Sequence, residues 1–279
     1  MSATSPVTLP RPASFWTVLS ATIIKNLQVI RRYLPNLVGL IVQMFVRVGF
    51  FLILSGFMVF EGTNNLAGER LFTFILAGLV LMVFNSTALY TPLNSVTQDL
   101  MNGTLEYLYA NPISRYAYYA GTVVASAIMD LIVFVPLFLF LVWHAGADLI
   151  SALSILAACL AVMVTLMAFG TMIALLGVLW RQVNSIVGVI SQLFEFLAGA
   201  YFPISEFPMA LKYAAWALPY TWGYDLVRYY SLGQGWKTLL PYQTEWVILI
   251  AEAAGFSIVA MVLLQLVERR AKKQGLHLL

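Results

Sequence analysis

Four ionisable residues stand inside long apolar stretches of this sequence: Arg47, Asp130, Glu195 and Glu252. A charge at the centre of a membrane helix costs about 2.5–3.5 kcal/mol on insertion scales, so such a residue needs a partner or a function. Arg47 could pair with Asp130 or Glu195, which would offset much of that cost. The alternative is a polar site in a transport path, where three acids and one base would weakly favour cationic substrates.

Motifs for nucleotide, metal or covalent chemistry are missing from the sequence. There is no G-x-x-x-x-G-K-[ST] phosphate loop to bind ATP and no H-E-x-x-H metal pair. The stretch Gly255-Phe256-Ser257 is similar to a serine-nucleophile turn, but it lies in an apolar helical run with no obvious histidine to act as its base. We therefore expect no catalytic residue, no metal site and no cofactor in this chain.

The overall composition is that of a membrane protein. Of 279 residues, 61% are hydrophobic and only 10% are charged, whereas a soluble domain has about 25% charged residues. The mean hydropathy is +0.87. A soluble enzyme and a nucleic-acid-binding protein are thereby excluded, and we expect an all-α polytopic membrane protein. The net charge of +3 then reflects membrane topology.

Six segments are long enough for the ~20 apolar residues that a bilayer requires. They are residues 34–60, 71–91, 116–143, 150–179, 184–202 and 245–267. We expect a membrane domain over 34–267, a disordered cytosolic tail over 1–13 and a basic cytosolic tail over 268–279.

Residues 14–33 are expected to form an amphipathic helix at the membrane surface. Their apolar side chains repeat at helical spacing, and polar ones such as Lys25 and Gln28 fall on the opposite face. Ser14 is a suitable N-cap and Pro35 a stop signal. The segment is too polar to cross the bilayer.

The distribution of Lys and Arg predicts the orientation. Ten of the 15 lie in one set of loops and tails: Arg11, Lys25, Arg31, Arg32, Arg115, Arg181, Arg269, Arg270, Lys272 and Lys273. Four lie in the other set: Arg70, Lys212, Arg228 and Lys237. The positive-inside rule therefore places both termini in the cytoplasm of a cell-membrane protein.

Two polar stripes on the predicted helices fit a translocation path. The stripe of the second span consists of Thr87, Thr91, Asn94 and Gln98, and that of the fifth span of Asn184, Gly188, Gln192, Glu195 and Gly199. Polar groups that face hydrocarbon are costly, so these stripes should face protein or water. They could line a path, or they could pack helices together through small and amide residues.

The cytoplasmic connection after the second span, residues 98–115, is expected to contain a short amphipathic helix. Pro112 should end it, because the residue before a proline avoids the helical region. Leu105 and Leu108 are three residues apart and give the helix an apolar edge, beside which Glu106 carries a carboxylate. Such an edge suits a partner's cleft, although an ordinary interhelical loop is the simpler alternative.

Two motifs in this order resemble the signature of ABC-2 type transporter permeases. The first is Gly-Thr-Leu-Glu at 103–106 followed by Asn-Pro-Ile-Ser at 111–114. Members often have Glu-Arg before the Gly-Thr, where this chain has Met-Asn. The second runs from Gly199 to Pro208 and is similar to the family's Phe-Pro turn after the fifth span. The resemblance covers nearly the whole chain.

The resemblance implies a coupling helix and an outer gate. The coupling residues toward the ATPase would be Asp99, Asn102, Gly103, Thr104, Leu105, Glu106, Leu108, Pro112 and Arg115. The gate would be a hairpin that re-enters the outer leaflet between spans five and six, with Phe202, Pro203, Pro208, Pro219 and Arg228. Such permeases pair as dimers, here expected to be a homodimer, and bind two nucleotide-binding subunits. Those partners would hold ATP and Mg, which fits the missing phosphate loop.

The sequence leaves the substrate open. The family resemblance implies export of a lipophilic drug-like or lipid-like molecule. An alternative is export of a lipid-linked polysaccharide, since 14% of the residues are aromatic and could stack on sugar rings. An aromatic belt at the membrane interfaces would also account for most of these side chains. An intramembrane enzyme or a passive channel is the more distant alternative.

Overall fold

The computed structural model describes residues 14–32, 34–61, 64–101, 115–179, 184–218 and 220–274. The helices in this part of the chain are α1 (Phe15–Arg32), α2 (Leu34–Ser55), α3 (Gly68–Met101), α5 (Arg115–Ala145), α6 (Leu149–Leu179), α7 (Asn184–Leu197), α8 (Met209–Trp216), α9 (Thr221–Leu232) and α10 (Tyr242–Gln274). Two 3-10 turns, η1 (Ile204–Glu206) and η2 (Gly233–Gly235), flank α8 and α9. A short antiparallel pair, β1 (Val59–Phe60) and β2 (Leu66–Ala67), links α2 to α3.

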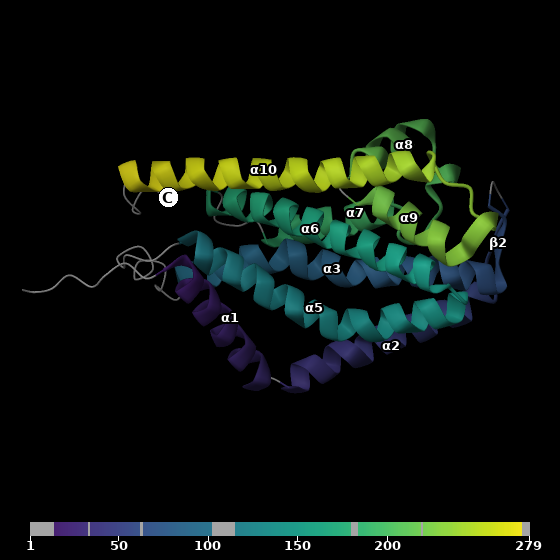
Figure 1. The fold of residues 1–279 in the computed structure, drawn as a ribbon, viewed down its shortest axis with the longest axis horizontal. Coiled ribbons are helices and arrows are strands. Elements are labelled where there is room, and N and C mark those ends of the chain that lie inside the picture. The colour runs from purple at the N-terminus through teal and green to yellow at the C-terminus, as the bar shows by residue number, and fades with distance from the viewer. Residues whose placement is uncertain are drawn as a thin grey trace, which may run out of the picture.

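The long helices run side by side in an elongated bundle (Figure 1). α3 packs against both α5 and α6, and α6 packs against α10. The β-hairpin, α8 and α9 lie toward one end of the bundle, while α1 and the C-terminal end of α10 lie toward the other (Figure 1). The two ends of the bundle are therefore built from different elements (Figure 1).

The core is centred on the first half of α3. Every residue from 71 to 84 is buried, and most of them are large and apolar. A helix that is apolar on all sides is stable only where other helices cover it. α3 is covered by α5, α6, α7 and α9, so the hydrophobic run of the second predicted span becomes the centre of the fold.

Four helices in the described part of the chain are long and apolar enough to cross a membrane. The qualifying stretches are Val38–Ser55, Ala120–Ala145, Leu149–Ile173 and Tyr242–Leu263. They match the first, third, fourth and sixth predicted spans, so the all-α, multi-pass architecture is confirmed. The second predicted span lies within α3, and the fifth begins with α7. The crossing of the bilayer by these two spans stays a prediction.

The fifth predicted span is longer than the helix that forms there. α7 ends at Leu197, five residues before the expected end at Phe202. Gly199 has φ +82°, a left-handed conformation that ends a helix and that suits glycine. At about 1.5 Å per residue, the 14 residues of α7 extend roughly 21 Å, short of the ~30 Å hydrocarbon thickness.

The predicted N-terminal helix forms as α1, in which the apolar residues Leu19, Ile23 and Leu27 are half-buried and the polar residues Lys25 and Gln28 are exposed. Val18 and Thr22 are its most buried side chains, while Phe15 and Trp16 are exposed. The cause is close contact with α5: a Cβ atom at Gly121 would collide with Thr22. A location of α1 at the membrane surface stays a prediction.

Candidate functional site

The predicted coupling segment lies between the end of α3 and the start of α5. α3 begins beside the β-hairpin and runs to Met101, and α5 begins at Arg115 and packs along α3. α3 therefore ends, and α5 begins, toward the end of the bundle opposite the β-hairpin (Figure 1). Asp99 lies in the last turn of α3, while the predicted coupling residues Asn102, Gly103, Thr104, Leu105, Glu106, Leu108 and Pro112 lie outside the described residues.

The polar stripe of the fifth predicted span lies on α7 and the turn after it. Gly188 and Glu195 are half-buried, Gln192 is exposed, and Gly199 is buried. Thr87 and Thr91, the predicted stripe of the second span, lie within α3, and Asn184 is the first residue of α7. In the polar stripe of the fifth predicted span, Gln192 in the middle is therefore at the surface of this chain, and Gly199 at the end is in its interior.

An open face of α7 surrounds Gln192. Val189, Leu193 and Phe196 are 59%, 53% and 43% exposed, and they follow each other at helical spacing. This face has apolar side chains with one amide among them. This face can contact lipid or another protein, and a molecule that binds here would also contact the Gln192 side chain.

Glu195 lies close to tyrosines from the turn after α7 and from α9. Tyr201 lies within electrostatic range of both the Glu195 carboxylate and the Arg47 guanidinium. Burial raises the pKa of Tyr220, with Tyr224 and Glu195 adding to the shift. Arg47 of α2 and Glu195 of α7 therefore act on the same hydroxyl, although a direct pairing between them stays a prediction.

One of these tyrosines, Tyr220, has a hydroxyl group that is free to donate a hydrogen bond. The Tyr220 side chain is 1% exposed, and its hydroxyl has no hydrogen-bond partner in the described part of the chain. Tyr201 stacks on Phe51 of α2 at a centroid distance of 5.5 Å. A carboxylate, an unsatisfied phenol and a guanidinium in one region can bind a polar headgroup of either sign.

The other two charges within predicted spans lie on different helices. Asp130 is 7% exposed on α5, and Glu252 is half-buried on α10. The indole of Trp222 from α9 lies beside the Glu252 carboxyl. The structure therefore spreads these charges over α2, α5, α7 and α10, and it brings Arg47 and Glu195 near a common group, Tyr201.

Arg228, predicted for the outer gate, is a buried cross-link between helices. Its side chain is 2% exposed, and Nη2 donates to the carbonyls of Gly199 and Ala200 at 2.6 and 3.0 Å. Nε donates to the carbonyl of Phe74 at 3.4 Å, and the guanidinium lies 3.6 Å from the centroid of the Phe74 ring. Arg228 thereby joins α9 to α3 and to the turn after α7.

The remaining predicted gate residues shape the path between α7 and α8. Phe202 contacts the rings of Phe60 and Phe196 edge-on. Pro203 and Pro208 precede η1 and α8, where their fixed φ suits a helix start. Pro219 lies outside the described residues. A gating role for this hairpin, and its place in the outer leaflet, stay predictions.

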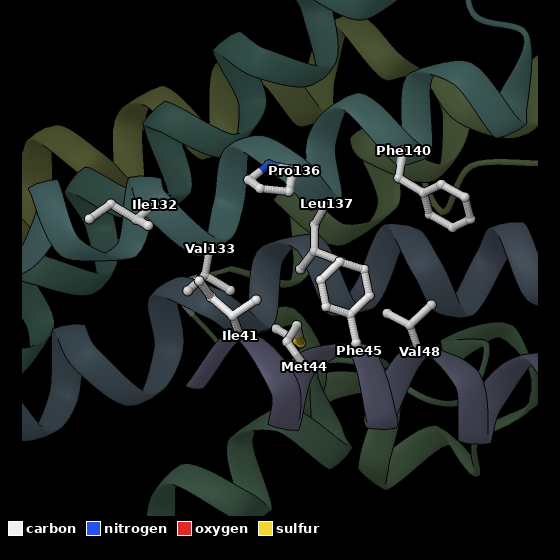
Figure 2. A pocket seen from close by; sticks show the side chains of 9 residues that line it. All are labelled: Ile41, Met44, Phe45, Val48, Ile132, Val133, Pro136, Leu137 and Phe140. Atoms are coloured by element: carbon white, nitrogen blue, oxygen red, sulfur yellow. The ribbon is translucent and has the colours of Figure 1, made fainter. Parts of the chain in front are cut away.

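An apolar groove separates α2 from α5 (Figure 2). Its cavity measures about 120 Å³ and is lined only by apolar side chains: Ile41, Met44, Phe45, Val48, Ile132, Val133, Pro136, Leu137 and Phe140. Both helices belong to the stretches long and apolar enough to cross a membrane. The groove can accommodate hydrocarbon, and no lining side chain could orient a sugar or another strongly polar group.

Sequence reasoning missed a second buried polar group at the β-hairpin end. It consists of Asp225 on α9, Trp236 after η2 and Glu245 in the first turn of α10. Asp225 precedes Arg228 by three residues on one helix face, which was a signal for a polar cluster. The contact with Glu245 depends on how α9 and α10 pack, and no local spacing reveals it.

Comparison with known families identifies the architecture. The family model described as ABC-2 type transporter matches residues 14–232. The chain belongs to the ABC-2 type transporter family. The match extends from α1 through α9, so it includes the coupling connection, α7 and the hairpin with Arg228. No curated protein matches this ABC-2 permease. Family membership makes it a multi-pass transport subunit, of a kind that generally works with a partner ATP-binding subunit.

Proposed function

We propose that this ABC-2 permease is the transmembrane subunit of an ATP-driven exporter in the cell membrane. It would move a lipophilic drug-like or lipid-like substrate out of the cytoplasm or the inner leaflet by alternating access. ATP and Mg would bind to a separate nucleotide-binding subunit, present in two copies. The excess of Lys and Arg in one set of loops supports cytoplasmic termini, and with them a coupling connection that faces this ATPase.

The groove between α2 and α5 is the observation that best supports a lipophilic or lipid-like substrate. Its lining is entirely apolar, and it lies between two helices of membrane-crossing length. Arg47 follows Met44 of this lining by one helical turn and approaches Tyr201 near Glu195. An amphiphilic molecule, with hydrocarbon in the groove and a polar group toward Arg47 and Glu195, matches that arrangement.

The buried aromatic residues favour a lipophilic substrate over a glycan. Trp222, Trp236 and Tyr220 are 4%, 6% and 1% exposed, so their faces are occupied by other side chains of this protein. They belong neither to an interfacial belt nor to a surface where sugar rings could stack. Trp143, at 76% exposed, is available at a helix end, as a belt residue would be.

The open face of α7 supports pairing with a second permease, which we propose to be an identical chain. Val189, Leu193 and Phe196 are 59%, 53% and 43% exposed in the described part of the chain, and the exposed polar side chain of Gln192 lies among them. A second copy would shield the amide from hydrocarbon, where an unsatisfied polar group is costly. It would also place a Glu195 from each protomer on either side of the shared interface.

A paired substitution on α5 tests the substrate class. Ile132 lines the groove and is 40% exposed, so Ile132→Trp should fill it with little disturbance of the core. Val135 is 45% exposed on the same helix but outside the groove, and Val135→Trp is the control. With the ATPase and permease in liposomes, flipping of a fluorescent phospholipid analogue should fall about tenfold for Ile132→Trp only, equivalent to about 1.4 kcal/mol. Equal rates in both variants would contradict a role for the groove.

A further inference from the structure

Two carboxyl groups meet in the buried contact between α9 and α10. Asp225 is 4% exposed and Glu245 is 0% exposed. The two carboxyl groups lie side by side, because they accept hydrogen bonds from the adjacent main-chain amides of Leu239 and Leu240. An ionised carboxylate can only accept hydrogen bonds, so a bond between two carboxyl groups requires a proton on one of them.

The hydrogen bonds around the pair identify which group carries the proton. Asp225 uses both oxygens as acceptors: Oδ1 accepts from Trp236 Nε1 at 2.7 Å, and Oδ2 accepts from the Leu239 amide at 2.7 Å. Glu245 Oε1 accepts from the Leu240 amide at 3.0 Å. Glu245 Oε2 is buried and has no donor among the described residues. Asp225 therefore has the environment of a carboxylate, and Glu245 that of a neutral acid.

The neighbouring charges balance one acid but not two. From α9, Arg228 lies close to Asp225 and directs its guanidinium to main-chain carbonyls and the Phe74 ring. α3 contributes Arg70, whose side chain donates to the carbonyl of Gly235. The segment before α10 contributes Lys237, whose amide bonds to Asn64, while α6 carries the thiol of Cys159 as its only titratable group.

The tyrosines packed on this end of α10 are engaged with aromatic partners. Tyr229 stacks on Tyr242 at 5.1 Å, and the Tyr230 hydroxyl accepts from Trp246 at 3.1 Å. No cation among the described residues reaches Glu245 directly. A second negative charge beside Asp225 would therefore be buried without compensation, which is strongly unfavourable.

We propose that Asp225 and Glu245 form a single-proton site that fastens the hairpin to α10 and releases it when the proton is lost. The site anchors the amides of Leu239 and Leu240, and through Trp236 it reaches Phe74 and Arg228. Deprotonation would place two carboxylates in contact and push residues 236–240 away from α10. This inference concerns the hairpin itself and holds whatever the substrate is.

The proposal predicts the sign of a pH effect. The folded protein would hold a proton at neutral pH that the unfolded chain, with an ordinary exposed glutamate, has released. Stability then falls as pH rises, by up to about tenfold in the folding equilibrium per pH unit for one proton. The unfolding temperature of the purified full-length protein should accordingly decrease as the pH rises above about 7, and the decrease should level off once the site has lost its proton in the folded protein.

Glu245→Gln is the decisive variant. A glutamine has the shape of the protonated acid, so its oxygen can accept from Leu240 and its amide can donate to Asp225. It should fold and lose the pH-dependent part of the change in unfolding temperature. Glu69→Gln, at an exposed acid in the first turn of α3, is the control and should keep the wild-type slope. A wild-type slope in Glu245→Gln, its loss in Glu69→Gln, or a Glu245→Gln protein that fails to fold would each overturn the proposal.

Hydrogen exchange provides a second measurement at the site. The peptide containing Leu239 and Leu240 should exchange faster in the wild type than in Glu245→Gln at alkaline pH, when both are compared at the same pH. The excess should grow by up to about tenfold per pH unit. Equal exchange in the two proteins throughout this range would show that no proton holds the hairpin.

Discussion

At the scale of single residues, Arg47 is the charge within a predicted span whose anionic partner has still to be identified. It is half-buried and is the only charged residue of α2, and it acts on Tyr201 together with Glu195. A guanidinium in that environment needs an anionic partner to offset its desolvation. Glu195 and Asp130 are the two acids predicted from the sequence for this role.

A double-mutant comparison should identify the partner of Arg47. Arg47→Ala is expected to lower stability by about 3–5 kcal/mol if it leaves a buried acid uncompensated. Adding Glu195→Gln should then recover part of the loss, whereas adding Asp130→Asn should not. Thermal unfolding in detergent measures both. Additive losses in both double mutants would mean that Arg47 pairs with neither acid.

Single residues also show the limit of the sequence. Arg228 was recognised by its position after a Phe-Pro turn, and the structure places it in the hairpin as expected. Its three carbonyl partners were not foreseeable, because they belong to α3 and to the turn after α7. Glu245 was assigned to the start of a span, yet its environment is set by Asp225, 20 positions earlier in the chain. Packing between elements determines both environments.

At the scale of elements, hydrophobic length predicted the long helices well and their ends less well. α5, α6 and α10 form where apolar stretches of sufficient length occur. α7 is shorter than expected because Gly199 turns the chain before the Phe-Pro pair does. α1 was predicted with the right bounds to within one residue, and its contact with α5 buries Val18 and Thr22 most deeply. Periodicity thus identified the elements, and tertiary contacts decided which of their residues are most buried.

Substitution of Gly78 in α3 would test how closely α3 and the turn after α7 approach each other. A Cβ atom at Gly78 would collide with the Ala200 carbonyl, the same oxygen that Arg228 binds. Gly78→Ala should therefore destabilise the protein by about 1–3 kcal/mol through overpacking. Gly49→Ala in α2, where no atom lies within 4 Å, should be neutral or stabilising by up to about 1 kcal/mol. Unfolding temperatures compare them directly, and equal effects would refute the close approach.

At the scale of the whole molecule, apolar exposure separates the helices that face lipid from those that form the core. α2 and α10 have many exposed large hydrophobic residues, while the first half of α3 and most of α9 are buried. An exposed apolar surface of this extent is stable only in a bilayer or under a partner. The two ends of the bundle also differ. The β-hairpin end has the buried hydrogen bonds of Arg228 and Asp225, whereas α3 ends and α5 begins toward the opposite end (Figure 1).

The connection between α3 and α5 is where we expect the cycle of a separate ATPase to reach the membrane domain. Because the sequence has no phosphate loop, the purified permease should hydrolyse no ATP alone, and it should co-purify with an ATP-binding subunit. Glu106→Ala should leave insertion and dimerisation unchanged but weaken ATPase binding or coupling by about 2–5 kcal/mol, as for a truncated charge in a desolvated contact. Glu69→Ala, in the first turn of α3 at the other end of the bundle, is the matched control and should behave as wild type. Pull-down of the ATPase, with hydrolysis and transport measured in liposomes, would distinguish the two variants. Wild-type values for Glu106→Ala in all three assays would reduce this connection to an ordinary loop and leave the ATPase to engage another surface.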